Sequence, residues 1–160
     1  MFAAPPPPPP YTWTTRDVVV QSVGTDRQWW LKATVDQVNR TGVVRLRFGT
    51  CDGVVQCIRV SSTPTLEHPD GGLVAGMAYV SVRLDTRKIV NVSIFMGDRV
   101  GSTLSYRERR TALNHEFLHA LGMSHDGNAA SVLTPYVEAG AVNIGAWDTR
   151  KLTNLYRYVP

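Results

Sequence analysis

Residues 115–125, HEFLHALGMSH, contain three of the chain's four histidines within eleven positions. On a helix, positions i and i+4 project from the same face, so His115 and His119 can offer their imidazoles to one cation. A third ligand cannot share that face at this spacing if the helix continues. Gly122 accepts the left-handed conformation that reverses a chain, so the residues after it can bring His125 back. The run therefore predicts a helix, a sharp turn and three converging imidazoles.

These residue types suit a catalytic zinc ion. Zinc favours nitrogen ligands in tetrahedral geometry, and a catalytic site needs three protein ligands and one open position. Glu116 follows the first histidine and is rotated by about 100° around the helix, which places it near the metal without making it a ligand. Zinc lowers the pKa of a water molecule to about 7, and a nearby carboxylate can accept the proton. We therefore expect one Zn²⁺ ion, with Glu116 as general base.

Two plainer interpretations of the same run stay open. The segment can be a surface helix with incidental histidines, or it can hold zinc in a purely structural role. A structural site would fill its fourth position with a protein ligand, for which Asp126 is the nearest candidate. The fourth histidine, His68, lies far away in a predicted loop, and we expect it to be an ordinary surface residue.

Hydrophobic periodicity predicts the other elements. Strands are expected at 17–23, 43–48 and 57–61, a hairpin at 77–84 and 90–96, and helices at 27–39 and 147–158. Ser105 and Glu108 form a capping-box signature that opens the histidine-bearing helix, and Gly122 ends it. The order of strand, helix, several strands and helix predicts an α/β sandwich in which helices back one sheet.

Composition places the chain among ordinary globular domains. Its 160 residues fit a single core, and 43% are hydrophobic. The net charge is +4, but the basic residues are spread along the sequence, and the densest cluster, at 107–110, has no aromatic residues between its arginines. We therefore expect a solvated basic face and no nucleic-acid binding. No apolar run approaches the roughly 18 residues that span a bilayer, so no membrane span is expected.

The chain begins with a compositionally distinct segment. We assign residues 1–13 to a proline-rich arm or linker and residues 14–160 to the catalytic domain. Six consecutive prolines favour an extended polyproline II rod, which serves as a spacer or docks on a protein partner. The first residues lack the apolar core of a secretory signal. The compartment is not assigned, although an extracellular or virion- and assembly-associated location is favoured.

The two cysteines, Cys51 and Cys57, flank a short segment that contains an Asp-Gly pair. This pair suggests a turn, so a small disulfide across a hairpin is the first interpretation. Two buried thiols are the alternative. Neither cysteine has the paired spacing of a structural zinc site.

Residues 115–125 resemble the extended zinc-binding signature of the metzincin peptidases, and the chain is nearest the matrixin-like branch. The segment 131–136 stands where that family makes a tight turn beneath the metal, and Leu155-Tyr156 resemble part of its last helix. The resemblance implies a zincin-like sandwich: a twisted mixed sheet with an antiparallel edge strand backed by helices, an active-site helix with HExxH, and a small C-terminal subdomain with a final helix. In the family the edge strand, here 77–84, binds extended polypeptide by strand addition.

The chain departs from the family pattern at two places. The turn beneath the metal normally carries a methionine, and here the position is Leu133, an apolar residue of similar volume that suits the same cushion. Asp126, directly after the third histidine, is more typical of other metzincin branches. Tyr136 follows the turn, and it either helps to stabilise an oxyanion or packs beside Pro135.

The sequence thus predicts a zinc metalloendopeptidase that acts on polypeptide. The alternative is a catalytically weak or inactive zinc-fold module that binds or supports a larger assembly, such as a virion tail or a surface complex. A third interpretation, a zinc hydrolase acting on other acyl groups, uses the same activated water.

Overall fold

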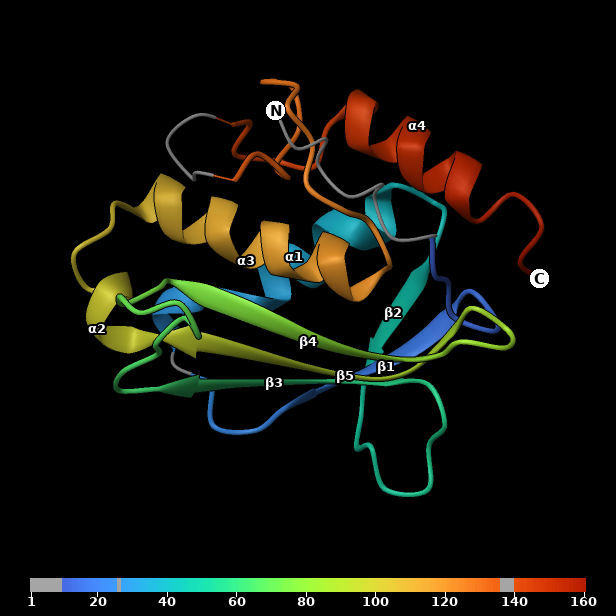
Figure 1. Ribbon diagram of the computed structural model, residues 1–160, viewed down its shortest axis with the longest axis horizontal. Helices are drawn as coiled ribbons and strands as arrows, with labels where there is room; N and C mark the ends of the chain where they lie inside the picture. Colours follow the sequence, from blue (N-terminus) through green and yellow to red (C-terminus); the bar gives the residue numbers. More distant parts are fainter. Residues whose placement is uncertain (1–9, 26, 136–139) are drawn as a thin grey trace.

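A computed structural model describes residues 10–25, 27–135 and 140–160 of the protein. In these residues one sheet is covered by a layer of helices. Helices α1, α3 and α4 all lie on the same side of the sheet (Figure 1). The elements in chain order are β1 Asp17–Ser22, the 3₁₀ helix η1 Arg27–Trp29, α1 Leu31–Arg40, β2 Arg45–Phe48, β3 Cys57–Thr63, β4 Gly76–Arg83, β5 Lys88–Gly97, α2 Asp98–Gly101, α3 Tyr106–Ala120 and α4 Ala146–Leu155.

The five strands form one mixed sheet in the order β2-β1-β3-β5-β4. Strands β2, β1, β3 and β5 run parallel, and β4 runs antiparallel to β5 at the edge. This arrangement confirms the predicted fold class, with its mixed sheet, antiparallel edge strand and backing helices.

Strand β4 leaves part of its backbone facing outward. In an antiparallel pair, residues that exchange ladder hydrogen bonds alternate with residues that do not. The Gly97 amide donates to the Ala75 carbonyl at 2.9 Å, which sets this alternation for the strand that follows. The peptide groups of Gly76, Ala78 and Val80 therefore point away from β5, toward the free edge of the sheet.

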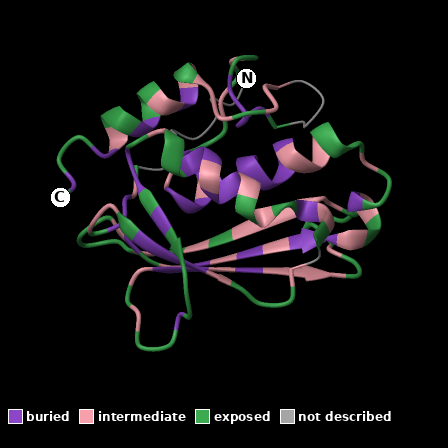
Figure 2. Cartoon of the chain, turned by 180° about the vertical axis from the view of Figure 1, so that it is seen from behind, coloured by how far each residue is buried: buried purple, intermediate pink, exposed green. Residues whose placement is uncertain are grey.

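The main core lies between α3 and the sheet. Alternating residues of β5, including Val92, Ile94 and Met96, are 0% exposed and meet the apolar side chains of α3. Leu113 and Phe117 on α3 are equally buried. Figure 2 shows the buried residues gathered on α3 and on the strands beneath it. This packing holds α3 rigidly against the sheet.

The region predicted as one helix, 27–39, is interrupted at Trp30. This residue adopts a left-handed conformation, with φ 54° and ψ 48°, between η1 and α1. The hydrophobic spacing is continuous across the break, so periodicity alone does not reveal it. Helix α2 was not predicted, because its four residues are too few to show a period.

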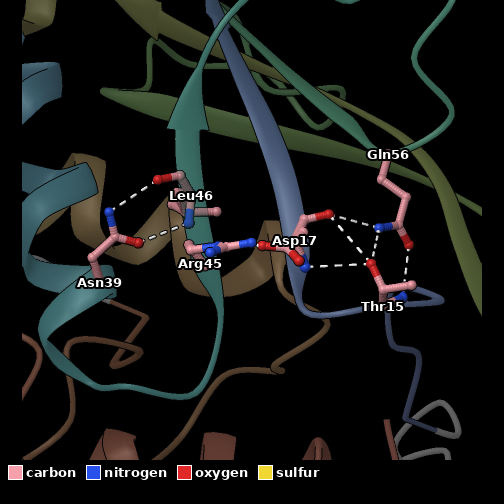
Figure 3. A network of polar contacts seen from close by, with 6 residues as sticks. All are labelled: Thr15, Asp17, Asn39, Arg45, Leu46 and Gln56. Carbon is pink, nitrogen blue, oxygen red and sulfur yellow. Dashed lines mark hydrogen bonds and ion pairs between the residues drawn. The ribbon is translucent and has the colours of Figure 1, made fainter. Parts of the chain in front are cut away.

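Side-chain hydrogen bonds fix the first residues of β1 and β2 (Figure 3). The Asn39 amide donates to the Leu46 carbonyl at 3.0 Å and accepts from the Leu46 amide at 2.7 Å. The Gln56 amide donates to the Thr15 hydroxyl at 2.6 Å and to the Asp17 carbonyl at 2.7 Å. These contacts tie the strand ends on the side of the molecule away from β4.

A disulfide joins Cys51 and Cys57, whose Cα atoms are 5.5 Å apart. The predicted disulfide is therefore confirmed, but it does not cross a hairpin, because β2 and β3 on either side of the loop do not pair with each other. The disulfide lies with Val19 in a small second cluster of buried residues, separate from the main core.

The start of the described chain packs against the domain. Thr12 forms a bridge with Lys88, and Trp13, which we placed in the proline-rich arm, is 0% exposed. Residues 1–9 lie outside the described part, so the role of the arm stays a prediction. Among the described residues, no helix is both long and apolar enough to cross a membrane.

Candidate metal centre

Helix α3 begins and ends as the sequence predicts. The Ser105 hydroxyl accepts from the Glu108 amide at 3.2 Å, and the Glu108 carboxylate accepts from the Ser105 amide at 2.6 Å, which completes the capping box. Beyond the last turn, Gly122 has φ +93°, and a Cβ atom there would lie 1.8 Å from the Tyr11 carbonyl oxygen. Only glycine fits this reversal, because a side chain would meet both the backbone strain and the neighbouring chain.

The reversal brings the three histidines of the run together. Their candidate ligand atoms all lie within 4.8 Å of one another. The Nε2 atom of His115 is 2.9 Å from Nε2 of His119 and 3.2 Å from Nε2 of His125. Two nitrogens bound to one tetrahedral zinc at 2.0–2.1 Å lie about 3.3 Å apart, so the observed spacing is close to that of a shared metal ion.

Hydrogen bonds to the other ring nitrogens point the lone pairs inward. Nδ1 of His115 lies 2.8 Å from the Val132 carbonyl oxygen, and Nδ1 of His119 lies 2.8 Å from the Met123 carbonyl oxygen. A carbonyl can only accept, so each Nδ1 carries the proton and each Nε2 presents a lone pair. Two lone pairs at 2.9 Å repel unless a cation lies between them. The donor set therefore fits a metal ion.

The protonation equilibria favour neutral ligands. Burial lowers the pKa of His115 below its usual value. Burial, together with the neighbouring His115, lowers the pKa of His119 to about 4. Neutral imidazole is the form that binds metal.

Glu116 lies beneath the free edge of β4. Its side chain is buried, with 8% of the residue exposed, and the Ala78 amide of β4 donates a hydrogen bond to the carboxyl group. Burial raises the pKa of this carboxyl to about 8. A Cβ atom at Gly76 would lie 2.8 Å from Cγ of Glu116, so the strand passes directly over the glutamate.

A cleft of about 630 Å³ runs beside these groups. Its walls are mostly apolar, and the polar side chains in it are histidines and Glu116. The lining residues are His68, Leu73, Val74, Ala75, Gly76, Met77, Ala78, Val100, Leu104, Ala112, His115, Glu116, His119, His125 and Pro135.

His68 was missed as a residue of the site. It is a surface residue, as predicted, with 47% of its side chain exposed, but it also lines the cleft. Its Nδ1 atom lies 3.2 Å from the amide nitrogen of Asp70, which donates to it. The bridge between Glu67 and Leu73 folds this loop back on itself. No local pattern in the sequence signals that fold, so the position of His68 could not be predicted.

The Asp126 side chain contacts α4 and is not part of the histidine cluster. Its carboxylate accepts from the Trp147 indole at 2.9 Å and forms an ion pair with Lys151. The described metal-ligating group contains only His115, His119 and His125. Asp126 therefore does not supply the fourth ligand that a structural zinc would need.

The turn at residues 131–133 is held by Asp148, which the sequence analysis did not identify as a residue of the site. Asp148, on the first turn of α4, is 0% exposed. Its carboxylate accepts from the Ser131 hydroxyl at 2.5 Å and from the Val132 amide at 3.3 Å. Leu133, the residue at the methionine position, is also 0% exposed. Tyr136 lies outside the described residues, so its predicted role stays a prediction.

No protein-family model matches this chain, and no curated protein sequence matches it. Archaemetzincin from Archaeoglobus fulgidus is one solved structure of similar fold, with 12% identity and a TM-score of 0.48, over 84% of this chain and 99% of that protein. Myroilysin is another, with 18% identity and a TM-score of 0.41, over 92% of this chain and 64% of that protein. The chain is thus similar in structure to archaemetzincin and myroilysin, and its three histidines form the cluster that the HExxHxxGxxH pattern predicts.

Proposed function

We propose that this chain is a zinc-dependent endopeptidase, in which His115, His119 and His125 hold the metal and Glu116 is the general base. The observation that carries the proposal is the convergence of three Nε2 atoms in a cleft that also contains a buried carboxyl group. Three histidine ligands leave one position of a tetrahedral ion open, which is typical of catalytic zinc. Zinc supplies Lewis acidity there, which polarises a carbonyl group and makes water acidic near neutral pH.

In this proposal, Glu116 transfers a proton from the attacking water to the leaving group. Its carboxylate accepts a proton from the attacking water and then returns it to the departing amine. The pKa of about 8 belongs to the site without a cation, and a divalent cation beside the carboxyl favours the charged form. The Ala78 amide holds the carboxyl in place, because it donates to the same group.

The free edge of β4 supports a polypeptide substrate. The outward N–H and C=O groups of Gly76 and Val80, together with the Ala78 carbonyl, can pair with an extended chain by strand addition. Such a chain would lie beside Glu116, since Ala78 contacts its carboxyl group. The apolar cleft walls would then receive side chains of the substrate.

The test is cleavage of an unfolded protein by the zinc-loaded chain, with Glu116→Gln as the matched variant. We expect the variant to keep one zinc per chain and to lose about 10²- to 10⁴-fold in kcat, because the general base is removed. Equal turnover by both proteins would contradict the role of Glu116. If both hold zinc and neither cleaves, the chain is a metal-stabilised binding module instead.

A further inference from the structure

The proposed function leaves one polar side chain of the cleft without a role. Among the described residues that line the cleft, the polar side chains are four histidines and Glu116. Three of the histidines form the metal-ligating group, and His68 does not belong to it. The side chain of His68 is 47% exposed, so a bound ligand can reach the ring.

Residues 66–74, which we call the cleft loop, hold His68 at a defined place. The His68 amide donates to the Gly72 carbonyl at 2.9 Å, which closes the loop on itself. A Cβ atom at Gly97 would lie 2.6 Å from the Val74 carbonyl oxygen, so the loop packs closely on the last residue of β5. His68 is therefore carried by a loop that is anchored to the sheet.

The contacts of the ring decide which nitrogen meets a ligand. Nδ1 of His68 lies 3.2 Å from the Asp70 amide nitrogen and 3.4 Å from a carboxylate oxygen of the same residue. In a neutral ring, Nδ1 accepts from that amide and the proton is on Nε2, whereas a protonated ring carries a proton on both nitrogens. Nε2 is therefore a donor in either state, and no described residue pairs with it.

The cleft loop leads directly into the free edge strand. It lies at the end of the sheet where β4 begins (Figure 1). Strand β4 starts at Gly76, where an added Cβ atom would touch the Glu116 side chain. An extended substrate that pairs with β4 therefore continues past Glu116 toward the cleft loop, on one side of the scissile bond.

The free donor suits a carboxylate group. A histidine N–H requires an acceptor, and bonds to an ionised acceptor are stronger than bonds to a neutral one. Glu116 is the one acidic residue in the described lining of the cleft, and the net charge of +4 attracts acidic chains. The Asp70 carboxylate lies on the Nδ1 side of the ring and is 90% exposed, so water and salt screen it. On the basis of the proposed function, we propose that Nε2 of His68 recognises an acidic side chain of the substrate, on the cleft-loop side of the scissile bond.

Peptide binding to the zinc-loaded Glu116→Gln chain tests this recognition without cleavage. The peptides have blocked ends and a fixed leucine, which the apolar walls can hold, and one glutamate is moved through three positions on each side of it. A matched series carries glutamine in place of glutamate. Fluorescence anisotropy should show about 3- to 10-fold tighter binding of glutamate than of glutamine at one position, as expected for a charge-assisted bond at a half-exposed site.

Two variants of His68 identify the donor. His68→Leu removes the N–H group, so it should bind the glutamate and glutamine peptides equally. His68→Gln keeps an N–H donor and should retain part of the preference for glutamate. A preference that survives in full in His68→Leu would overturn the assignment. A gain that appears only when the C-terminal carboxylate is unblocked would overturn the side chain as the group that is recognised.

The result is separable from the test of peptidase activity. Cleavage of protein by the parent, combined with equal binding of both peptide series, overturns the role of His68 and leaves the proposed function intact. A glutamate preference in a chain that does not cleave supports His68 as a recognition residue and contradicts catalysis. Failure of every peptide to bind overturns both the role of His68 and strand addition on β4.

Discussion

Asp148 connects α4 to His115 through the backbone of a single residue, Val132. Its buried carboxylate accepts from the Val132 amide, and the Val132 carbonyl lies 2.8 Å from Nδ1 of His115. An asparagine has one acceptor oxygen in place of two, so Asp148→Asn leaves one of the two bonds to the turn unmade. We expect about 10- to 100-fold weaker zinc affinity and a loss of about 1–3 kcal/mol in the free energy of unfolding.

Competition with a zinc-binding dye and chemical denaturation measure these two effects of Asp148→Asn. The matched control is Asp85→Asn, because the side chain of Asp85 is 67% exposed. Unchanged zinc affinity with reduced stability would limit Asp148 to a role in folding.

Leu133 occupies the position where metzincins carry a methionine, and it is 0% exposed. Leucine and methionine have similar volumes, so exchange between them in a core usually changes the free energy of unfolding by less than about 1.5 kcal/mol. We therefore expect Leu133→Met to leave thermal unfolding and zinc affinity almost unchanged. A rise of more than 10-fold in zinc affinity or turnover would show that the leucine had limited the site.

The capping box stabilises the first turn of α3. Ser105→Ala removes the acceptor for the Glu108 amide, and the loss of such a cap costs about 1 kcal/mol. Chemical denaturation should show this decrease in the free energy of unfolding. Ser105→Asp, which restores an acceptor, should recover most of it. A loss that both variants share would have another cause.

The same cap makes the free energy of unfolding depend on pH in acidic solution. Hydrogen bonds from the Ser105 side chain and backbone lower the pKa of Glu108 below its ordinary 4.5. A lowered pKa means that the stabilisation is fully present above about pH 4.5 and is lost as the pH falls through the folded-state pKa. The stability difference between the parent and Glu108→Gln should therefore shrink below pH 4.5. A difference that stays constant with pH would contradict this assignment.

Zinc binding should raise the stability of the folded protein as a whole. A ligand that binds only the folded state adds about 2.7 kcal/mol when it is present at 100 times its dissociation constant. Zinc should therefore raise the Tm of the parent chain, and a chelator should reverse the effect. His125→Ala, which removes the exposed member of the histidine cluster, should show a much smaller rise. An equal rise in both proteins would indicate binding elsewhere.

The histidine-bearing helix and the hairpin of β4 and β5 could be predicted from the sequence, because both are specified by residues that lie close together along the chain. The capping residues, the i and i+4 histidines and Gly122 act within a few residues of one another, and so do the alternating side chains of β4 and β5. Contacts between distant segments were not predictable. Asp148 contacts Val132 only because α4 packs against the turn at residues 131–133, and Ala78 contacts Glu116 only because β4 packs against α3.

Under the proposed function, the disulfide between Cys51 and Cys57 would also protect the loop between these residues from autolysis. The loop that it closes is a natural target for self-digestion, with Val55 80% exposed. A substrate must straighten to lie along β4, which over six residues takes about 20 Å. The disulfide holds the two Cα atoms 5.5 Å apart, so the loop cannot straighten. If the chain is a peptidase as proposed, we expect the oxidised loop to resist autolysis and the reduced loop to be cleaved.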